Sequence, residues 1–384
     1  MSSPARIRAD ACPGVFATHD AADGPLARVR LPGGVVSAER LRVLASCAED
    51  LGDGDVHLTS RGNVQLRGVT RPGLASRLTA AGLLPSPTHE RVRNVLASPL
   101  SGVHGGTADV RGLAGELDVA LCAEPELAEL PGRFLFAFDD GRGDVAGEGA
   151  DVCWRAVTSD AGTVLLAGVD TGWSVARGEA VAALLAVARE FAAQRGTAWR
   201  IAELADSTAV LPRGPRSEPV DRPVRVDPTV GPLGDRGVGV APRFGQLTAA
   251  QLRVLASLAG HADLAGHAGH AVVTPWRSVV LPDAAPDAVA RLHAAGLSTD
   301  PAALEITACI GRPGCAKSLA DVRADAARLV PAGVRAHVAG CARRCGRPSA
   351  PHLDVVAEAG GYRVGGRLLP ASRLAESLVR KENP

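Results

Sequence analysis

The chain has 384 residues, a formal net charge of +1 and 46% apolar residues, of which few are aromatic. The balanced charge gives no indication of nucleic acid or a membrane surface as a partner, and no apolar run approaches the ~20 residues of a transmembrane helix. The first residues, Met1–Arg6, lack the apolar core of a signal peptide, so we expect a cytoplasmic protein of about two or three domains.

The first 84 residues predict a small unit of strand, helix, strand and helix. A strand is expected at Leu26–Leu31, followed by a helix that starts at Ser37, a good N-cap residue. A second stretch of strand is expected around Val56–Thr59 and Val64–Leu66. A second helix then covers Gly73–Ala81 and ends where a glycine follows.

This unit is repeated in the second half of the chain. Leu41–Ser46 recurs as Leu252–Ser257, and Arg77–Leu83 recurs in the same order as Arg291–Leu297. Thr248, followed three residues later by glutamine, predicts a capping box at the start of the second copy's first helix. The matches in register indicate duplication of a whole α+β unit with helices on one face of a sheet.

A different, sheet-rich segment follows each copy. In the first, strands are expected at Leu117–Cys122, Arg133–Phe138 and Val164–Ala167, with a closing helix at Glu179–Gln194. In the second, a helix is expected at Ala316–Leu329. The predicted limits are a ferredoxin-like half-domain at 1–84, an α/β lobe at 85–210, a Pro-rich linker at 211–232, a second half-domain at 233–300 and a metal-binding lobe at 301–384.

Four cysteines near the C-terminus form two pairs, Cys309 with Cys315 and Cys341 with Cys345, on loops rich in Gly, Pro and Arg. Four thiolates are the ligands of a [4Fe–4S] cluster, so the pattern predicts a redox protein. Structural zinc is an alternative, although its cysteine pairs usually have closer spacing than the first pair. Two disulfides are a further alternative that a cytoplasmic location disfavours.

Together, the duplication and the cysteine spacing resemble the sirohaem-dependent nitrite and sulfite reductase family over nearly the whole chain. The segments Ala11–Phe16, Phe138–Asp144 and Thr274–Arg277 are similar to its oxygen-using branch, the precorrin-3B synthases. The resemblance implies two ferredoxin-like half-domains in a pseudo-twofold repeat, with two larger α/β lobes around a cleft. It also implies that the four cysteines hold the [4Fe–4S] cluster, and that in the reductases the cysteine at the position of Cys345 bridges to sirohaem iron.

The same resemblance implies a set of polar residues that bind an anionic tetrapyrrole. Guanidinium groups suit its acetate and propionate arms, because they hold carboxylates through paired, charge-assisted hydrogen bonds. The candidate binding residues are Arg61, Asn63, Gln65, Arg93, Asn94, Arg133 and Arg277. The reductases carry two lysines where this chain has Arg133 and Leu135, and the loss of a proton-donating cation disfavours reduction of sulfite or nitrite.

The implied activity is therefore O₂-dependent hydroxylation and lactone formation that convert precorrin-3A to precorrin-3B. A sirohaem-dependent reductase and a non-catalytic Fe–S or tetrapyrrole sensor are the alternatives. Oxygen activation implies a second iron, for which mononuclear non-haem iron is favoured over sirohaem. His19, His104, His267 and His270 are possible ligands, Cys12 is a free cysteine on a tight turn, and no catalytic residue is identified.

The expected partners follow from the same activity. They are precorrin-3A, O₂ and a separate reductase or ferredoxin. NADH serves as an indirect electron source, because no Gly-x-Gly-x-x-Gly motif follows a predicted strand. No nucleic acid or membrane partner is expected, and the chain is expected to be a monomer.

Overall fold

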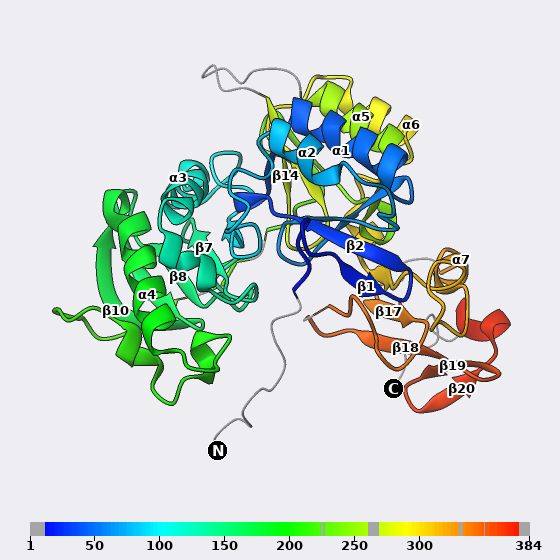
Figure 1. Cartoon of the computed structure of the whole chain (residues 1–384). Helices are drawn as coiled ribbons and strands as arrows, with labels where there is room; N and C mark the ends of the chain where they lie inside the picture. The colour runs from blue at the N-terminus through cyan, green and yellow to red at the C-terminus, as the bar shows by residue number, and fades with distance from the viewer. Residues whose placement is uncertain are drawn as a thin grey trace.

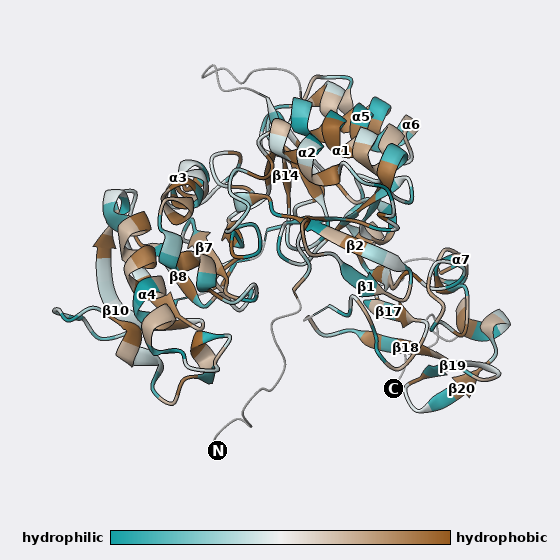
Figure 2. Cartoon of the chain, in the orientation of Figure 1, coloured by the Kyte–Doolittle hydropathy of each residue, from teal (hydrophilic) through white to brown (hydrophobic). Residues whose placement is uncertain are grey.

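The computed structural model describes residues 12–222, 224–225, 227–259, 269–329, 333–348 and 350–375. The described residues form four five-stranded sheets with helices packed on them, arranged as a central body and two lobes (Figure 1). Figure 2 shows that helices α1 and α5 alternate hydrophobic and hydrophilic residues, as expected for helices that cover a sheet. Within these ranges no helix is long and apolar enough to cross a membrane.

Each of the two central sheets takes its last strand from the other copy of the repeat. The first sheet has the order β1-β2-β5-β4-β13 and the second β11-β12-β15-β14-β3. Their strands are β1 (His19–Ala21), β2 (Gly24–Val29), β5 (Val64–Leu66), β4 (Asp55–Leu58) and β13 (Gln246–Thr248), then β11 (Gly231–Leu233), β12 (Gly237–Val240), β15 (Val279–Leu281), β14 (His270–Val273) and β3 (Val35–Ser37). The exchange of β3 and β13 interlocks the two copies.

The exchanged strands lead directly into the two long helices of the repeat, α1 (Ala38–Leu51) and α5 (Ala249–Leu258). Ser37 caps α1 by accepting a hydrogen bond from the Arg40 amide, and Thr248 forms the predicted capping box with Gln251. The two helices pack on each other, next to the shorter α2 (Leu74–Ala80) and α6 (Ala288–Ala294). Buried residues of both copies form one hydrophobic core.

The N-terminal lobe is built on a sheet of order β10-β9-β8-β7-β6, shown at the left of Figure 1. Its strands are β10 (Val169–Ala176), β9 (Ala161–Leu166), β8 (Val152–Ala156), β7 (Phe136–Asp139) and β6 (Val95–Ala97). Helices α3 (Arg111–Cys122) and α4 (Ala180–Gln194) cover one face. A small apolar cluster that includes Leu96, Leu135 and Val145 lies apart from this core.

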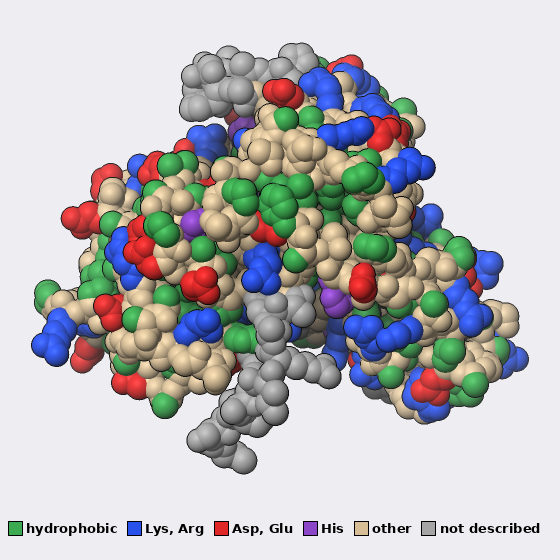
Figure 3. All heavy atoms as spheres, in the orientation of Figure 1, with side chains coloured by type: hydrophobic (Ala, Val, Ile, Leu, Met, Phe, Trp, Pro, Cys, Tyr) green, Lys and Arg blue, Asp and Glu red, His purple; other side chains and the backbone are tan. Residues whose placement is uncertain are grey.

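The C-terminal lobe carries a sheet of order β16-β17-β18-β19-β20 and one short helix, α7 (Val322–Ala326). The strands are β16 (Ile306–Ala308), β17 (Ala336–Ala339), β18 (Leu353–Glu358), β19 (Gly361–Val364) and β20 (Arg367–Leu369). β16, β17 and β18 run parallel, so their carboxyl ends lie at one edge of the sheet. Figure 3 shows Lys and Arg side chains gathered on the side of this lobe that faces the middle of the molecule.

Most of the predicted elements are confirmed, and two are wrong. The segment Leu117–Cys122 is helical, because Leu113, Leu117 and Leu121 recur every four residues and form the buried face of α3. The helix predicted at Ala316–Leu329 is reduced to α7, since Asp321 caps a new start by accepting a hydrogen bond from the Ala324 amide. The domain limits given above stay a prediction.

Candidate functional site

The two cysteine pairs lie on loops that follow two adjacent parallel strands. Cys309 comes directly after β16 and Cys341 almost directly after β17, so sheet geometry places both loops at the same edge. The backbone amide of Cys309 donates to the Val338 carbonyl at 3.0 Å. The Gly340 amide lies 3.2 Å from the Cys309 Sγ. The strand order therefore makes these loops converge, although 25 residues separate the two pairs.

The pKa of Cys309 reflects two of the other cysteines. Burial raises the pKa of Cys309, and the neighbouring Cys345 and Cys315 raise it further. A deprotonated Cys309 is therefore costly unless a cation binds its thiolate, which is the situation of a metal ligand.

The thiols do not stand in the geometry of a tetrahedral zinc site. Zn–S bonds of about 2.3 Å in a tetrahedron put the sulfurs about 3.8 Å apart. Among the residues that the structure describes, no three of these thiols have all their sulfurs within 4.8 Å of one another. A polar atom is also left open beside the loops. His337 on β17 is fully buried and its Nδ1 contacts Thr307, but its Nε2 finds no partner within the described ranges. The donor set fits a [4Fe–4S] cluster.

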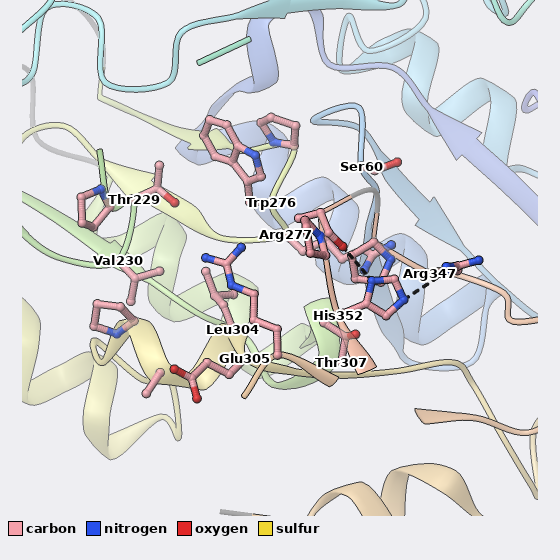
Figure 4. A pocket seen from close by; sticks show the side chains of 18 of the residues that line it. Ser60, Thr229, Val230, Trp276, Arg277, Leu304, Glu305, Thr307, Arg347 and His352 are labelled. Atoms are coloured by element: carbon pink, nitrogen blue, oxygen red, sulfur yellow. Dashed lines mark hydrogen bonds between the residues drawn. The ribbon is translucent and has the colours of Figure 1, made fainter. Parts of the chain in front are cut away.

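A cavity of about 990 Å³ opens beside the cysteine loops (Figure 4). Residues of the first half-domain, the N-terminal lobe, the second half-domain and the C-terminal lobe all contribute to its wall. Four arginines line it, namely Arg61, Arg277, Arg335 and Arg347.

Three acidic residues that line the cavity are each engaged by a donor. Glu148 accepts from Trp276 Nε1 at 2.9 Å, Asp227 from Arg142 at 3.0 Å and Glu305 from the Gly333 amide at 3.1 Å. Arg347 pairs with Asp354 at 3.7 Å, and Arg277 donates to the Gly346 carbonyl. Arg61 and Arg335 are therefore the arginines best placed to bind a ligand, and the cavity suits a large anion.

Of the predicted tetrapyrrole ligands, Arg61 and Arg277 reach the cavity. Burial lowers the pKa of Arg61 to about 10, and the positive charges of Arg200 and Arg28 lower it further. Its Nη1 lies 3.5 Å from the Gly132 carbonyl, which is a weak contact. A crowded, poorly paired cation of this kind is suited to bind a carboxylate.

Three other predicted ligands are engaged within the fold. Asn63 accepts from the Leu31 amide at 2.8 Å, and Asn94 donates to the Gly132 carbonyl at 3.0 Å; both side chains are fully buried. Gln65 lies between Arg28 and Arg67. That these three residues bind a tetrapyrrole stays a prediction.

Arg93 points away from the cavity into a buried ion pair. Its Nε and Nη2 lie 2.6 and 2.7 Å from the two carboxylate oxygens of Asp118, and the Arg93 side chain is only 3% exposed. The ion pair connects the residues just before β6 to α3, so the Arg93 side chain contacts the fold of the N-terminal lobe.

Replacing Arg93 by methionine is expected to lower the free energy of unfolding by about 3 kcal/mol, because it leaves Asp118 charged and half-enclosed. Chemical denaturation measures this change. The variant Arg93→Met/Asp118→Leu, which removes both charges, is expected to recover most of the loss. If Arg93→Met is as stable as wild type but binds the tetrapyrrole more weakly, Arg93 is a tetrapyrrole ligand.

The two positions occupied by lysine in the reductases do not line the cavity. Arg133 is exposed and lies over the Trp199 ring at 5.3 Å. Leu135 is 2% exposed and belongs to the apolar cluster of the N-terminal lobe. Neither side chain is placed to deliver a proton to a ligand in the cavity.

Several basic residues near the cavity were missed in the sequence. Arg28 and Arg30 alternate along the end of β2, and burial lowers the pKa of Arg30 to about 9, with Arg28 lowering it further. Cys12 lies close enough to both, and to Arg61, to influence their charge. The alternation of two arginines along one strand was the signal, because residues two apart share a face.

The histidines considered for a second iron do not converge. His19 lies on β1, His104 in a loop and His270 on β14, and the cavity wall includes none of them. His267 lies outside the described residues. In the described part of the chain, the one group of three metal-type ligand atoms within 4.8 Å is Asp139, Asp140 and Asp144.

That acidic group is already satisfied by the protein. Asp139 accepts hydrogen bonds from four backbone amides of the loop that follows it, and Arg142 pairs with Asp140 at 2.8 Å. Burial and the Asp139 charge raise the pKa of Asp144 to about 7. The group holds the loop that carries Glu148 to the cavity. In the described ranges, no two histidines and a carboxylate bring their ligand atoms within 4.8 Å of one another.

Comparisons with known proteins agree with this geometry. A family model for the nitrite/sulfite reductase ferredoxin-like half domain matches residues 19–79. The structure of the Mycobacterium tuberculosis NirA protein superimposes with a TM-score of 0.70 at 23% identity, covering 93% of this chain and 80% of that one. The chain therefore has the nitrite/sulfite reductase fold.

The resemblance extends to particular enzymes. The precorrin-3B synthase of Sinorhizobium sp is 28% identical over 93% of this chain and 83% of its own length. The sulfite reductase [ferredoxin] of Mycobacterium tuberculosis H37Rv is 30% identical over 79% of this chain and 62% of its own length. The chain thus resembles precorrin-3B synthase. It also resembles ferredoxin-dependent sulfite reductase, over a smaller share of that enzyme's length. These relatives support an oxidoreductase.

Proposed function

We propose that the chain is a precorrin-3B synthase-like mono-oxygenase of aerobic cobalamin biosynthesis, with precorrin-3A and O₂ as substrates. The observation that carries the proposal is the arginine-lined cavity beside the cysteine loops. Its volume of about 990 Å³ is at the upper end of small-molecule sites. A tetrapyrrole with many carboxylate arms matches both this size and the positive charge of the wall.

The residues of the chain have separable roles in this reaction. Cys309, Cys315, Cys341 and Cys345 would hold the [4Fe–4S] cluster, which supplies one-electron transfer when bound. Arg61, from the first half-domain, and Arg335, from the C-terminal lobe, bind substrate carboxylates. Together they fix the macrocycle and so orient the carbon to be hydroxylated.

Glu148 is the carboxyl group placed to hold a proton in the cavity. Burial raises its pKa, while the hydrogen bond from Trp276 Nε1 lowers it again in part and fixes its Oε1. In the overall reaction one oxygen atom enters the product and the other leaves as water. Two electrons and two protons are consumed, and NADH supplies the electrons through a separate protein.

The second candidate is a sirohaem-dependent reductase of sulfite or nitrite, which the fold and the sulfite reductase relatives favour. The buried position of Leu135 and the outward position of Arg133 disfavour it, because multi-electron reduction of a small oxyanion needs protons delivered at the ligand.

Cofactor content tests the choice between the two. The protein is purified without oxygen, iron and acid-labile sulfide are quantified, and any tetrapyrrole is extracted for its absorption spectrum. We expect a cluster, additional iron and no sirohaem. Stoichiometric sirohaem would move the assignment to the sulfite or nitrite reductase.

A further inference from the structure

The turn between β14 and β15 sends two neighbouring side chains to two different lobes. Trp276 reaches the N-terminal lobe at Glu148, and Arg277 reaches the C-terminal lobe at the Gly346 carbonyl. Thr274 fixes the turn, since its hydroxyl accepts from the amides of Trp276 and Ser278 at 3.2 Å each. Figure 4 shows Arg277 beside the cavity, close to His352.

The backbone at Arg277 is held in an unfavourable conformation. Its φ of 61° lies in the left-handed region, which non-glycine residues rarely adopt and which costs about 1 kcal/mol or more. The Arg277 amide donates to the Thr274 carbonyl at 3.2 Å, so the turn itself maintains this conformation. Such a strained backbone conformation is retained where it gives the side chain a direction that the structure needs.

The path of the Arg277 side chain is kept open by a glycine. A Cβ atom at Gly245 would lie 2.8 Å from Arg277 Cδ and 3.0 Å from its Cβ, closer than real contacts allow. Gly245 itself has a φ of 68°, so both its backbone and the neighbouring side chain require glycine there. The stem of Arg277 therefore crosses the second half-domain toward the cysteine loop.

At the far end, Arg277 Nη2 donates to the Gly346 carbonyl at 2.9 Å, and Gly346 directly follows Cys345. A Cβ atom at Gly346 would lie 3.6 Å from Arg277 Nη2 and 3.9 Å from the ring of His337. In the same loop, Arg344 has a positive φ of 46°. The guanidinium of Arg277 and the imidazole of His337 thus both lie next to Gly346, in a loop with a strained backbone at Arg344.

The charge of Arg277 has no acidic partner. Within the described ranges desolvation is the one cause that shifts its pKa, which it lowers, and no carboxylate acts on it. A half-buried cation without a carboxylate carries a desolvation cost, so an anionic group beside it would account for its presence. The cysteine thiolates and the cluster that they hold would be that anionic group.

We propose that Arg277 is a positioning residue for the loop Cys341–Gly346: it fixes the Gly346 carbonyl and sets a positive charge beside the cluster ligand Cys345. The inference rests on the proposed cluster site and is independent of the substrate. One turn of the second half-domain thereby connects the wall of the cavity to the redox centre.

Arg243 provides a matched control. It also belongs to the second half-domain and its Nη2 also donates to a backbone carbonyl of the C-terminal lobe, that of Ala327, at 2.8 Å. That carbonyl directly follows α7 and lies outside the loop Cys341–Gly346. Arg243→Met therefore removes an equivalent bond between the same two parts of the chain.

The experiment compares wild type, Arg277→Met, Arg277→Lys and Arg243→Met as full chains purified without oxygen. Iron release to a ferrous chelator and the cluster reduction potential are measured. Arg277→Met is expected to release iron about tenfold faster, as for loss of one charge-assisted hydrogen bond, and to have a more negative potential. Arg277→Lys keeps the charge, so its potential is expected near wild type with intermediate release. Arg243→Met is expected to match wild type.

Equal release rates and potentials in wild type and Arg277→Met would overturn the positioning role while leaving the cluster site intact. If Arg277→Met does not fold, Arg277→Lys decides, and release at the rate of Arg243→Met would overturn the role. A wild-type protein without iron and sulfide would overturn the cluster site and the positioning role together.

Discussion

Replacing Cys315 by serine is expected to remove most of the iron and acid-labile sulfide from the anaerobically purified protein, from about four of each to less than about one. A hydroxyl is a poor ligand for a cluster, and the remaining three thiols would leave one of its four irons without a cysteine. Visible absorption and electron paramagnetic resonance, with chemical iron and sulfide analysis, measure the loss.

Cys122→Ser is the matched control for this substitution. Cys122 ends α3 in the N-terminal lobe and is partly buried, as Cys315 is, but it lies outside the two pairs. Its replacement is expected to leave iron and sulfide at the wild-type level. Full retention of both in Cys315→Ser would exclude Cys315 from the ligand set.

Replacing Arg61 by alanine is expected to weaken precorrin-3A binding by about 10- to 150-fold, while the absorption spectrum of the cluster stays unchanged. Loss of a hydrogen bond between two charged groups costs about 1.5–3 kcal/mol, and each 1.4 kcal/mol is tenfold in affinity. Anaerobic titration followed by tetrapyrrole fluorescence quenching gives the dissociation constant.

Arg42→Ala controls for the loss of one positive charge from the first half-domain. Arg42 is exposed on α1, away from the cavity wall. It is expected to bind like wild type at moderate salt, since exposed charges more than about 10 Å from a ligand are screened. If Arg61→Ala and Arg42→Ala bind equally well, the carboxylate-binding role of Arg61 is wrong.

The repeat could be predicted from the sequence because Leu41–Ser46 recurs as Leu252–Ser257, and because helix caps are local signals. Ser37 and Thr248 mark the same position in both copies, and both helices begin there. The exchange of β3 and β13 could not be predicted. Each strand has three residues and could pair with either sheet, so the choice depends on packing between copies.

The residue types of the candidate site could be predicted from the sequence, but most of the contacts that these residues make could not. The convergence of the cysteine loops follows from two adjacent parallel strands, which the spacing alone did not show. A motif containing Arg93 or Asn94 cannot tell whether a side chain points to a cavity or to a partner such as Asp118, because both environments favour the same polar groups. Arg335 and Arg347 stand in no recognisable motif, and only the folded cavity brings them together with Arg61.

The most direct test of the account is turnover of precorrin-3A under ¹⁸O₂, with NADH and an added electron-transfer reductase, followed by mass spectrometry. The account predicts a product that contains one labelled oxygen atom, with no product when O₂ is excluded. Unchanged precorrin-3A under these conditions, together with six-electron reduction of sulfite or nitrite by the same preparation, would contradict it.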